Sequence, residues 1–398
     1  MLTDPRLATR TRHMQSNAIR EILKVVSKPG MISLAGGIPA PESFPTERMD
    51  EIFGTVMAKY GAQALQYDAT EGFEPLRVAL SDYLAQQSVQ ASAEEILIFS
   101  GSQSVLDTVA KMVISPGDII VTEEPTYLGA LSAFAPYEPR YRTVSTDEEG
   151  MIPEALEEVL KTEAVKLIYL TPTFQNPTGY TLSLARRRAI GQLLQTYNCL
   201  LLEDDPYSAL RYRGHALPPV WSFAPEQVIY SSTLSKVFAP GLRIGFCVAP
   251  EWLRPWLVVA KQGVDLHTST LNQALAVEYL TGGHLPEQLA TIIELYRPRQ
   301  EALLQALTQH FPQDFIWSRP EGGMFVWVIG PEGLDAEAVY WSSVEKGTAF
   351  VPGKYFFAQP ETGLSTMRLN FTMVDESTLD HAVQVIAEAI QEATAETA

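Results

Sequence analysis

The sequence predicts an α/β protein, with a large domain built on a mostly parallel sheet between helices and a smaller α+β domain. Three observations carry this prediction. Short β-rich runs alternate with helix-period segments between about residues 95 and 250, these runs are almost continuously apolar, and the pattern changes after about residue 290.

The β-rich runs cover residues 96–99, 118–121, 167–170, 200–202, 228–230 and 245–248. Strands that alternate with helices favour a parallel sheet joined by helical crossovers. Because the runs are apolar throughout, we expect helices to bury both faces of the sheet. Ligands of such folds bind at the carboxyl ends of the strands, so polar residues that follow a strand are the candidates for a site.

The segment after residue 290 predicts a separate domain, because a long helical stretch over 285–309 is followed by strand-like runs at 324–328 and 367–371. We expect an N-terminal arm and part of the small domain over 1–47, the large cofactor-binding domain over 48–290 and the small domain over 291–398. The arm holds an amphipathic stretch at 17–26 and is expected to reach over the active site or a neighbouring subunit.

Charge and hydropathy narrow the range of partners. The chain has 398 residues and a formal net charge of −18, and its one short basic run, Arg186–Arg188, is interpreted as a solvated helix face. Nucleic acid and anionic membranes are therefore poor partners. The N-terminus carries charges throughout and no window reaches the length of a membrane span, so we expect a cytoplasmic protein.

The cysteines and histidines do not predict a metal or redox site. Cys199 and Cys247 each lie in an apolar run, which indicates buried, unpaired thiols. The six histidines are scattered without ligand spacing, so no metal is expected.

The segment 231–245 is the most informative one. Lys236 lies between two predicted strands, with hydroxyl residues around it and Arg243 seven positions later. A lysine amine can form an imine with a phosphorylated aldehyde, while Thr233, Ser235 and Arg243 can hold the phosphate. A turn with only a structural role is the alternative, so other segments must decide.

A second candidate segment covers residues 98–104. A predicted strand passes through Ser100-Gly101-Ser102 into a helical stretch at 105–113. The backbone N–H groups and the dipole of a helix start form an anion site. A helix simply capped by serine is the alternative.

Two further segments place polar residues after predicted strands. Asn176 could donate a hydrogen bond to a ring oxygen of the cofactor, and the Asn176–Pro177 bond is a candidate for the cis form. Asp204 and Asp205 follow a buried strand, where an unpaired carboxylate would be costly, so a cationic partner is implied. For one of the two, a solvated loop acid is the alternative.

In this order along the chain, these segments closely resemble the fold-type I, class I/II aminotransferases, which use pyridoxal 5′-phosphate (PLP). The resemblance covers essentially the whole chain, from Gly36-Gly37 to Arg368. Within the class, the chain looks most like the α-aminoadipate and kynurenine/aminoadipate aminotransferases, notably at residues 15–23, 34–41, 65–67 and 262–268.

The resemblance implies a role for each matching position around the cofactor. Lys236 would be the Schiff-base lysine and proton shuttle, and Asp204 would pair with the pyridine nitrogen. Asn176 and Tyr207 would donate to the ring oxygen, and Tyr127 would stack on the ring. The phosphate would be held by residues from both subunits of a homodimer: Ser102, Gln103, Ser235 and Arg243 with Tyr67 of the second subunit.

The resemblance also implies how substrate binds. Arg368, with Asn176, would bind the substrate α-carboxylate, and Gly37 would leave room beside it. Arg20 matches an arginine that recognises the distal carboxylate of aminoadipate, although an exposed helix residue is the alternative. The sequence departs from the family at Thr233, where the family usually has serine or glycine. Threonine still supplies a hydroxyl at this position.

The function that the resemblance implies is amino transfer by a ping-pong mechanism, from a 2-aminoadipate-like donor to a 2-oxo acid such as 2-oxoglutarate. Glutamate, leucine and aromatic amino acids are further candidate donors. A broad-specificity aromatic, branched-chain or kynurenine aminotransferase is the first alternative. A PLP-dependent lyase and a PLP-binding regulator are weaker ones, because fold alone does not determine chemistry and the acidic chain shows no DNA-binding module.

Overall fold

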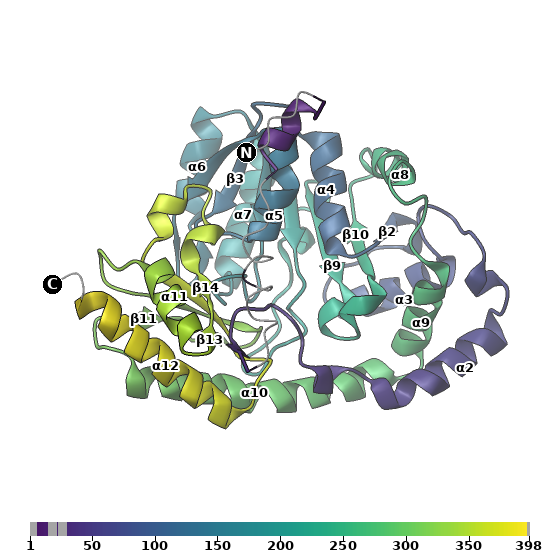
Figure 1. Ribbon diagram of the computed structural model, residues 1–398. Coiled ribbons are helices and arrows are strands. Elements are labelled where there is room, and N and C mark those ends of the chain that lie inside the picture. The colour runs from purple at the N-terminus through teal and green to yellow at the C-terminus, as the bar shows by residue number, and fades with distance from the viewer. Residues whose placement is uncertain (1–5, 15–21, 23–29, 396–398) are drawn as a thin grey trace.

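The computed structural model describes residues 6–14, 22 and 30–395. Its centre is a seven-stranded sheet covered by helices (Figure 1). In spatial order the strands are β2 (Ile96–Phe99), β10 (Gly245–Val248), β9 (Val228–Thr233), β8 (Leu201–Asp204), β7 (Val165–Leu170), β3 (Ile119–Glu123) and β4 (Arg140–Val144). The fold is the predicted fold type I architecture, a mostly parallel sheet between helices with a small domain.

The sheet is mixed because β10 runs antiparallel to both of its neighbours, β2 and β9, while the pairs from β9 to β4 are parallel. The six strands expected from apolar runs are present, and β4 is an additional strand at the edge. Its residues are mostly exposed or half-buried, so it lacks the continuous apolar run by which the other strands were found.

Successive side chains of each central strand enter two different cores. Ile98 packs in one core and Phe99 in the other, and the same alternation places Leu201 and Leu202 on opposite faces. Both faces are therefore buried, as expected. One face is covered by α4 (Ser102–Val113), α5 (Leu128–Phe134) and α8 (Arg254–Gln262), and the other by α3 (Glu74–Ala85), α6 (Pro153–Thr162), α7 (Leu184–Tyr197) and α9 (Thr270–Thr281).

The small domain has a four-stranded antiparallel sheet of β11 (Ile316–Trp317), β12 (Phe325–Ile329), β15 (Thr366–Asn370) and β14 (Val351–Pro352). The helices α11 (Ala336–Glu345) and α12 (Glu376–Ala395) accompany it. In Figure 1, α10 (His284–His310) runs along the bottom of the molecule beneath both parts, and it packs on α12.

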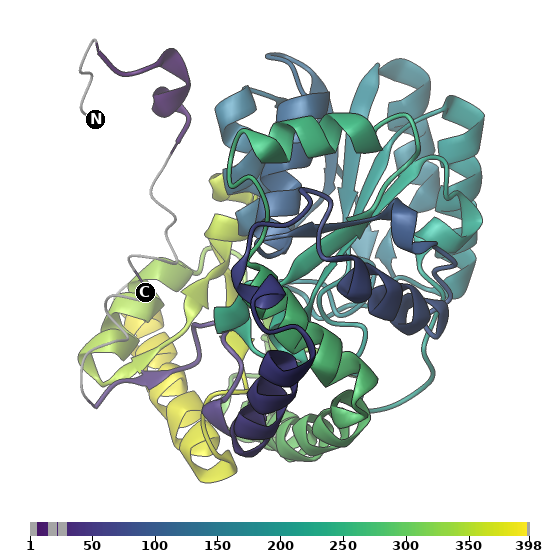
Figure 2. The same ribbon diagram turned by 90° about the vertical axis from the view of Figure 1, so that its right-hand side faces the viewer.

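Segments near the N-terminus contact both parts of the molecule. β1 (Ile32–Ser33) pairs in parallel with β13 (Thr348–Ala349), and α2 (Met49–Lys59) packs on α9. The short helix η1 (Thr9–Arg12) contacts η6 (Ala135–Tyr137), and Figure 2 shows the segment 6–14 projecting from the body of the molecule. Most of the amphipathic stretch predicted at 17–26 lies outside the described residues. None of the helices in the described part of the chain is both long and apolar enough to cross a membrane.

Candidate active site

A cavity of about 290 Å³ lies where β3, β7, β8 and β9 end and α4 begins. All but two of the predicted site residues line it: Gly37, Ser102, Gln103, Tyr127, Asn176, Asp204, Tyr207, Ser235, Lys236, Arg243 and Arg368. The carboxyl ends of neighbouring parallel strands meet at one edge of a sheet, which brings the residues that follow β3, β7, β8 and β9 together. Gly37 and Arg368 reach the cavity from outside this sheet, from the segment after β1 and from β15 of the small domain.

Lys236 lies at the end of the short helix η8 (Leu234–Lys236), directly after β9. Its Nζ donates a hydrogen bond to the Gly37 carbonyl oxygen at 3.0 Å, across the cavity wall. Burial, together with the charges of Arg243 and Arg368, lowers the pKa of Lys236 to about 8. A substantial fraction of the amine is therefore neutral near physiological pH, as a nucleophile or a general base requires.

Three consecutive carboxylates, Glu203, Asp204 and Asp205, are all buried, so the alternative of a solvated loop acid is wrong. The two outer acids are bonded away from the cavity. Glu203 accepts from the backbone N–H groups of Val220 and Trp221, and Asp205 accepts from Tyr230 and Ser208; the corresponding distances are 2.9, 2.8, 3.0 and 3.1 Å.

Asp204 differs from both neighbours. Its Oδ2 accepts from Tyr169 Oη at 2.9 Å, but its Oδ1 is buried without a hydrogen-bond partner among the described residues. Burial raises the pKa of Asp204 to about 7, and the Tyr169 hydrogen bond opposes this shift. A buried carboxylate oxygen with nothing to bind implies a proton donor or cation that occupies the cavity.

Asn176 and Arg368 are held together in the inner part of the cavity. Arg368 Nη1 donates to Asn176 Oδ1 at 2.8 Å and Nη2 donates to the Ala35 carbonyl at 2.5 Å. Asn176 Nδ2 lies 3.5 Å from Tyr207 Oη, a long contact. The Asn176–Pro177 peptide bond is cis, as anticipated.

Arg368 is 1 % exposed and lies between two aromatic rings. Its guanidinium carbon is 4.2 Å from the centre of the Phe325 ring and 4.9 Å from that of Phe356. Burial lowers its pKa to about 10, so the group stays charged at neutral pH. Its Nε has no partner within the described ranges, so the guanidinium retains a donor for an anionic ligand.

The opposite end of the cavity is shaped to receive an anion. The N-cap of α4 is Gly101, with φ of 88°, so no serine caps the helix and the capping alternative is wrong. A Cβ on Gly101 would lie 2.2 Å from Arg243 Nη2, and one on Gly245 would lie 2.4 Å from the backbone N of Ser102. The two glycines therefore let Arg243 and the first turn of α4 come together.

Two side chains at this end are engaged in other contacts. Gln103 Nε2 donates to the Gly129 carbonyl at 2.8 Å, so its backbone N–H is the group placed for an anion. Thr233 Oγ1 donates to the Ile244 carbonyl at 2.8 Å and accepts from the Ser235 backbone N at 3.2 Å. Thr233 Oγ1 also lies 2.9 Å from Ser235 Oγ, so the two hydroxyls are bonded to each other and Thr233 stabilises the turn before Lys236.

Tyr127 and Tyr207 flank the centre of the cavity. Burial raises the pKa of Tyr127 to about 12 and also raises the pKa of Tyr207 above its ordinary value, so both hydroxyls are neutral donors at physiological pH.

Two predicted residues are not placed in the cavity. Tyr67 is 76 % exposed and its ring packs edge-on against His267, with ring centroids 5.6 Å apart. Arg20 lies outside the described residues, so its predicted role is untested.

The prediction missed Tyr169 and the two aromatic residues beside Arg368, Phe325 and Phe356. A tyrosine within a fully apolar strand requires a partner for its hydroxyl, and this signal could have identified Tyr169. The two phenylalanines gave no such signal, because the same residues are expected in any buried strand or turn.

The residues of the cavity fit PLP. Asp204 offers an unpaired oxygen to a pyridine nitrogen, Lys236 offers an amine to the aldehyde, and the α4 N-terminus with Arg243 offers N–H groups and a positive charge to the phosphate. Within the described ranges, no group of three His, Cys, Asp or Glu side chains is arranged to hold a metal ion.

Comparison with known proteins agrees with this fit. The family model described as aminotransferase class I and II matches residues 46–386. An aromatic-amino-acid aminotransferase from Thermococcus litoralis is 45 % identical over 387 residues, which cover 95 % of this chain and 92 % of that protein.

Two solved structures resemble the whole chain. A multiple-substrate aminotransferase from Thermococcus profundus has a TM-score of 0.94 at 41 % identity, and all of both chains is covered. An α-aminoadipate aminotransferase from Thermus thermophilus, solved with N-(5′-phosphopyridoxyl)-L-leucine, has a TM-score of 0.92 at 38 % identity, again over both whole chains. The chain therefore belongs to the class I and II aminotransferases and is a PLP-dependent enzyme of fold type I.

Proposed function

We propose that this aminotransferase moves the amino group of a 2-aminoadipate-like donor to 2-oxoglutarate, in two half-reactions at the one cavity. The observation that carries the catalytic part is the pairing of an unbonded, buried oxygen of Asp204 with the amine of Lys236 in the same cavity. When bound, PLP supplies a ring that accepts the electrons left on the substrate α-carbon.

In this proposal Lys236 moves the proton. With PLP and substrate bound, the Lys236 amine would take the proton from the substrate α-carbon and hand it on within the same cavity. The lowered pKa of Lys236 supports this role, because a protonated lysine cannot accept a proton. Asp204 would keep the ring nitrogen protonated, since its buried charge needs a cationic partner in addition to the Tyr169 hydrogen bond.

The remaining side chains bind and orient. Arg368 would hold the α-carboxylate through guanidinium N–H groups that are not bonded to Asn176 or Ala35. Asn176 and Tyr207 would donate hydrogen bonds to the ring oxygen. Tyr127 lines the same cavity and would hold the ring by stacking on it. The phosphate is held by Ser102, Gln103, Ser235 and Arg243, with Tyr67 of a second copy of the chain.

The exposure of Tyr67 supports its proposed place at a subunit boundary, because a largely exposed aromatic side chain is available to a second copy. A homodimer with shared active sites and a cytoplasmic location remain predictions from the sequence. Sedimentation of the purified protein would test the dimer.

Spectroscopy of the cofactor-loaded enzyme tests the function. Adding 2-aminoadipate, glutamate, leucine or kynurenine singly should convert the visible absorbance of bound PLP into the near-ultraviolet absorbance of pyridoxamine phosphate, and the rates rank the donors. Adding 2-oxoglutarate should then reverse the change. Release of pyruvate or ammonia without an acceptor would instead indicate a lyase.

A broad-specificity aromatic aminotransferase is the second candidate, favoured by the aromatic and multiple-substrate relatives. Arg20 separates the two. Replacing Arg20 by Gln should slow dicarboxylic donors about tenfold or more, but leucine and aromatic donors much less. Equal losses for all donors would favour the broad-specificity candidate.

A further inference from the structure

Arg187 is almost completely buried, although the run Arg186–Arg188 was expected to form a solvated helix face. It is 1 % exposed on α7, whereas Arg188 next to it is exposed. Burial lowers the pKa of Arg187, but the negative fields of Glu203 and Asp205 oppose the shift. The expectation is therefore wrong for Arg187, because its side chain is enclosed by the loop after β7 and by Pro218.

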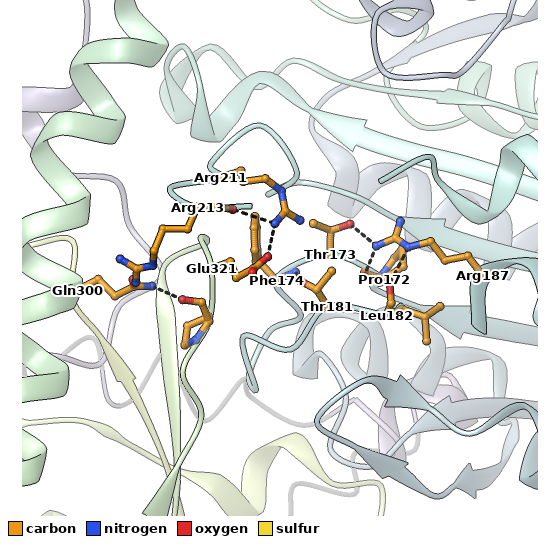
Figure 3. Close-up of polar contacts among 11 residues, drawn as sticks. Pro172, Thr173, Phe174, Thr181, Leu182, Arg187, Arg211, Arg213, Gln300 and Glu321 are labelled. Atoms are coloured by element: carbon orange, nitrogen blue, oxygen red, sulfur yellow. Dashed lines mark hydrogen bonds and ion pairs between the residues drawn. The ribbon is translucent and has the colours of Figure 1, made fainter. Parts of the chain in front are cut away.

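The Arg187 guanidinium binds both ends of one loop. Its Nη2 donates to the Pro172 carbonyl at 2.7 Å and to Thr173 Oγ1 at 2.8 Å, and its Nε donates to the Leu182 carbonyl at 2.8 Å (Figure 3). Nη1 donates to the Pro218 carbonyl at 3.2 Å. One side chain thus anchors the start and the end of the loop 171–182.

These contacts require an arginine in particular. In the described part of the chain no carboxylate lies within ion-pair distance of Arg187, so its neighbours are carbonyl and hydroxyl oxygens. Burying an unpaired cation is costly, and an apolar residue would avoid that cost. The planar fork with its five donors can reach several acceptors in different directions, which a lysine ammonium cannot do in the same geometry.

The other side of the loop is held by the small domain. Phe174, buried with φ of 50°, lies under Arg211, whose guanidinium carbon is 4.7 Å from the ring centre. Arg211 also bonds to Glu321 at 2.6 Å (Figure 3). A Cβ on Gly322 would lie 2.4 Å from the Phe174 ring, so the two segments are in close contact.

Asn176 lies between the two anchored ends of this loop. The ends are also bonded to each other, Leu182 N to the Pro172 carbonyl at 2.8 Å. Asn176 in turn accepts from Arg368 at 2.8 Å, so a displacement of the loop would move the carboxylate-binding guanidinium as well.

We propose that Arg187 is a positioning residue, which sets the place of Asn176 and through it of Arg368 without touching substrate or cofactor. The inference rests on the proposed roles of those two residues. The proposal gives a role to Arg187, the buried member of the basic run Arg186–Arg188, which is not among the residues expected to bind cofactor or substrate.

The test compares the PLP-loaded Arg187→Lys variant with wild type and with Arg188→Ala, a matched control one residue away. Arg187→Lys should raise the KM for the amino donor about tenfold, with a smaller effect on kcat, because the substrate carboxylate is bound less well. Arg187→Lys should also shift the pH midpoint of the cofactor's visible absorbance, in the same direction as the Asn176→Ala substitution does. Arg188→Ala should change neither quantity.

A double-mutant cycle separates positioning from general destabilisation. If Arg187 acts through Asn176, Arg187→Lys should add little to the midpoint shift already caused by Asn176→Ala. Additive shifts, or a lower Tm with wild-type KM and midpoint, would overturn the proposal. If Arg187→Lys does not fold, Thr173→Val removes one acceptor and keeps the arginine, and it should give a smaller shift of the same sign.

The cycle also distinguishes this proposal from the proposed function. If Asn176→Ala itself leaves KM and the midpoint unchanged, the proposed role of Asn176 fails and the positioning proposal fails with it. If Asn176→Ala has the expected effect and Arg187→Lys does not, only the positioning proposal is overturned.

Discussion

The inner wall of the cavity and its anion-binding rim are built differently. Asp204, Asn176 and Arg368 of the inner wall are 3, 5 and 1 % exposed and are bonded to other parts of the same chain. Gln103 and Arg243 at the rim are exposed, and within the described part of the chain the Arg243 guanidinium makes only long contacts, of 3.3 and 3.4 Å, to backbone carbonyls.

The difference indicates where binding energy is prearranged. In the inner wall the charged groups are desolvated when the chain folds. Each of them therefore interacts strongly with a ligand, but destabilises the folded protein when no ligand is bound. At the rim water and salt screen the charges, and the phosphate itself must order them. Substitutions in the inner wall should therefore have larger effects than substitutions at the rim.

The largest effect is expected at Lys236. Lys236→Ala should lower kcat about 10⁴-fold, because proton transfer by a positioned group is lost, and should abolish the pH-dependent visible absorbance of the loaded enzyme. Stopped-flow and static spectra measure both. Near-normal turnover by a folded Lys236→Ala protein would refute the assignment.

Asp204→Asn should lower kcat/KM about 10³-fold, the equivalent of losing one buried ion pair with the cofactor ring. The same substitution should stabilise the cofactor-free protein at pH 8 by about 4 kcal/mol. The raised pKa means that the folded form keeps Asp204 protonated up to about pH 7, whereas the unfolded chain ionises it at its ordinary, lower pKa. The free energy of unfolding therefore falls as pH rises toward 7, and the Asn variant lacks this fall.

Denaturant titrations of both cofactor-free proteins at several pH values would measure this difference. A pH dependence that is identical in wild type and Asp204→Asn would mean that Asp204 is not a buried, neutral acid in the cofactor-free state.

Arg368→Lys should lower kcat/KM for amino donors about 10²-fold, mainly through KM. A lysine keeps the charge but loses the fork that binds a carboxylate through two hydrogen bonds and stacks between Phe325 and Phe356. Steady-state kinetics with PLP saturating would measure the change. If PLP affinity falls instead while the donor KM is unchanged, Arg368 binds the cofactor and not the substrate.

The smallest effect is expected at the rim. Arg243→Gln should weaken PLP binding about tenfold, with a loss that shrinks at high salt.

Capture of PLP by the cofactor-free enzyme should speed up with pH, with a midpoint near 8, since only the neutral Lys236 amine reacts. Removing the Arg243 cation should move that midpoint to higher pH, while Arg188→Gln should not move it.

Much of the site could be predicted from the sequence, because its polar residues directly follow apolar strands. Asp204 ends such a strand, Asn176 and Lys236 come after others, and all three line the same cavity. Tyr67 could be singled out by resemblance but not placed, since its proposed partner is a second copy of the chain. The edge strand β4 was missed because its exposed, charged residues do not form an apolar run.

The sequence by itself determined which strands are buried and which side chains lie at their ends, because hydrophobic burial and the two-residue period of a strand are local properties. The resemblance pointed to Asp204 among the three adjacent acids, but only the tertiary structure shows the physical reason. Glu203 and Asp205 find partners at Val220 and Tyr230, while Asp204, among the described residues, is bonded to Tyr169 alone. The structure likewise decided that Arg187 is buried and Arg188 is not. In both cases the deciding partners are supplied by other parts of the fold, so the local sequence gives no physical reason to separate neighbouring residues with the same chemistry.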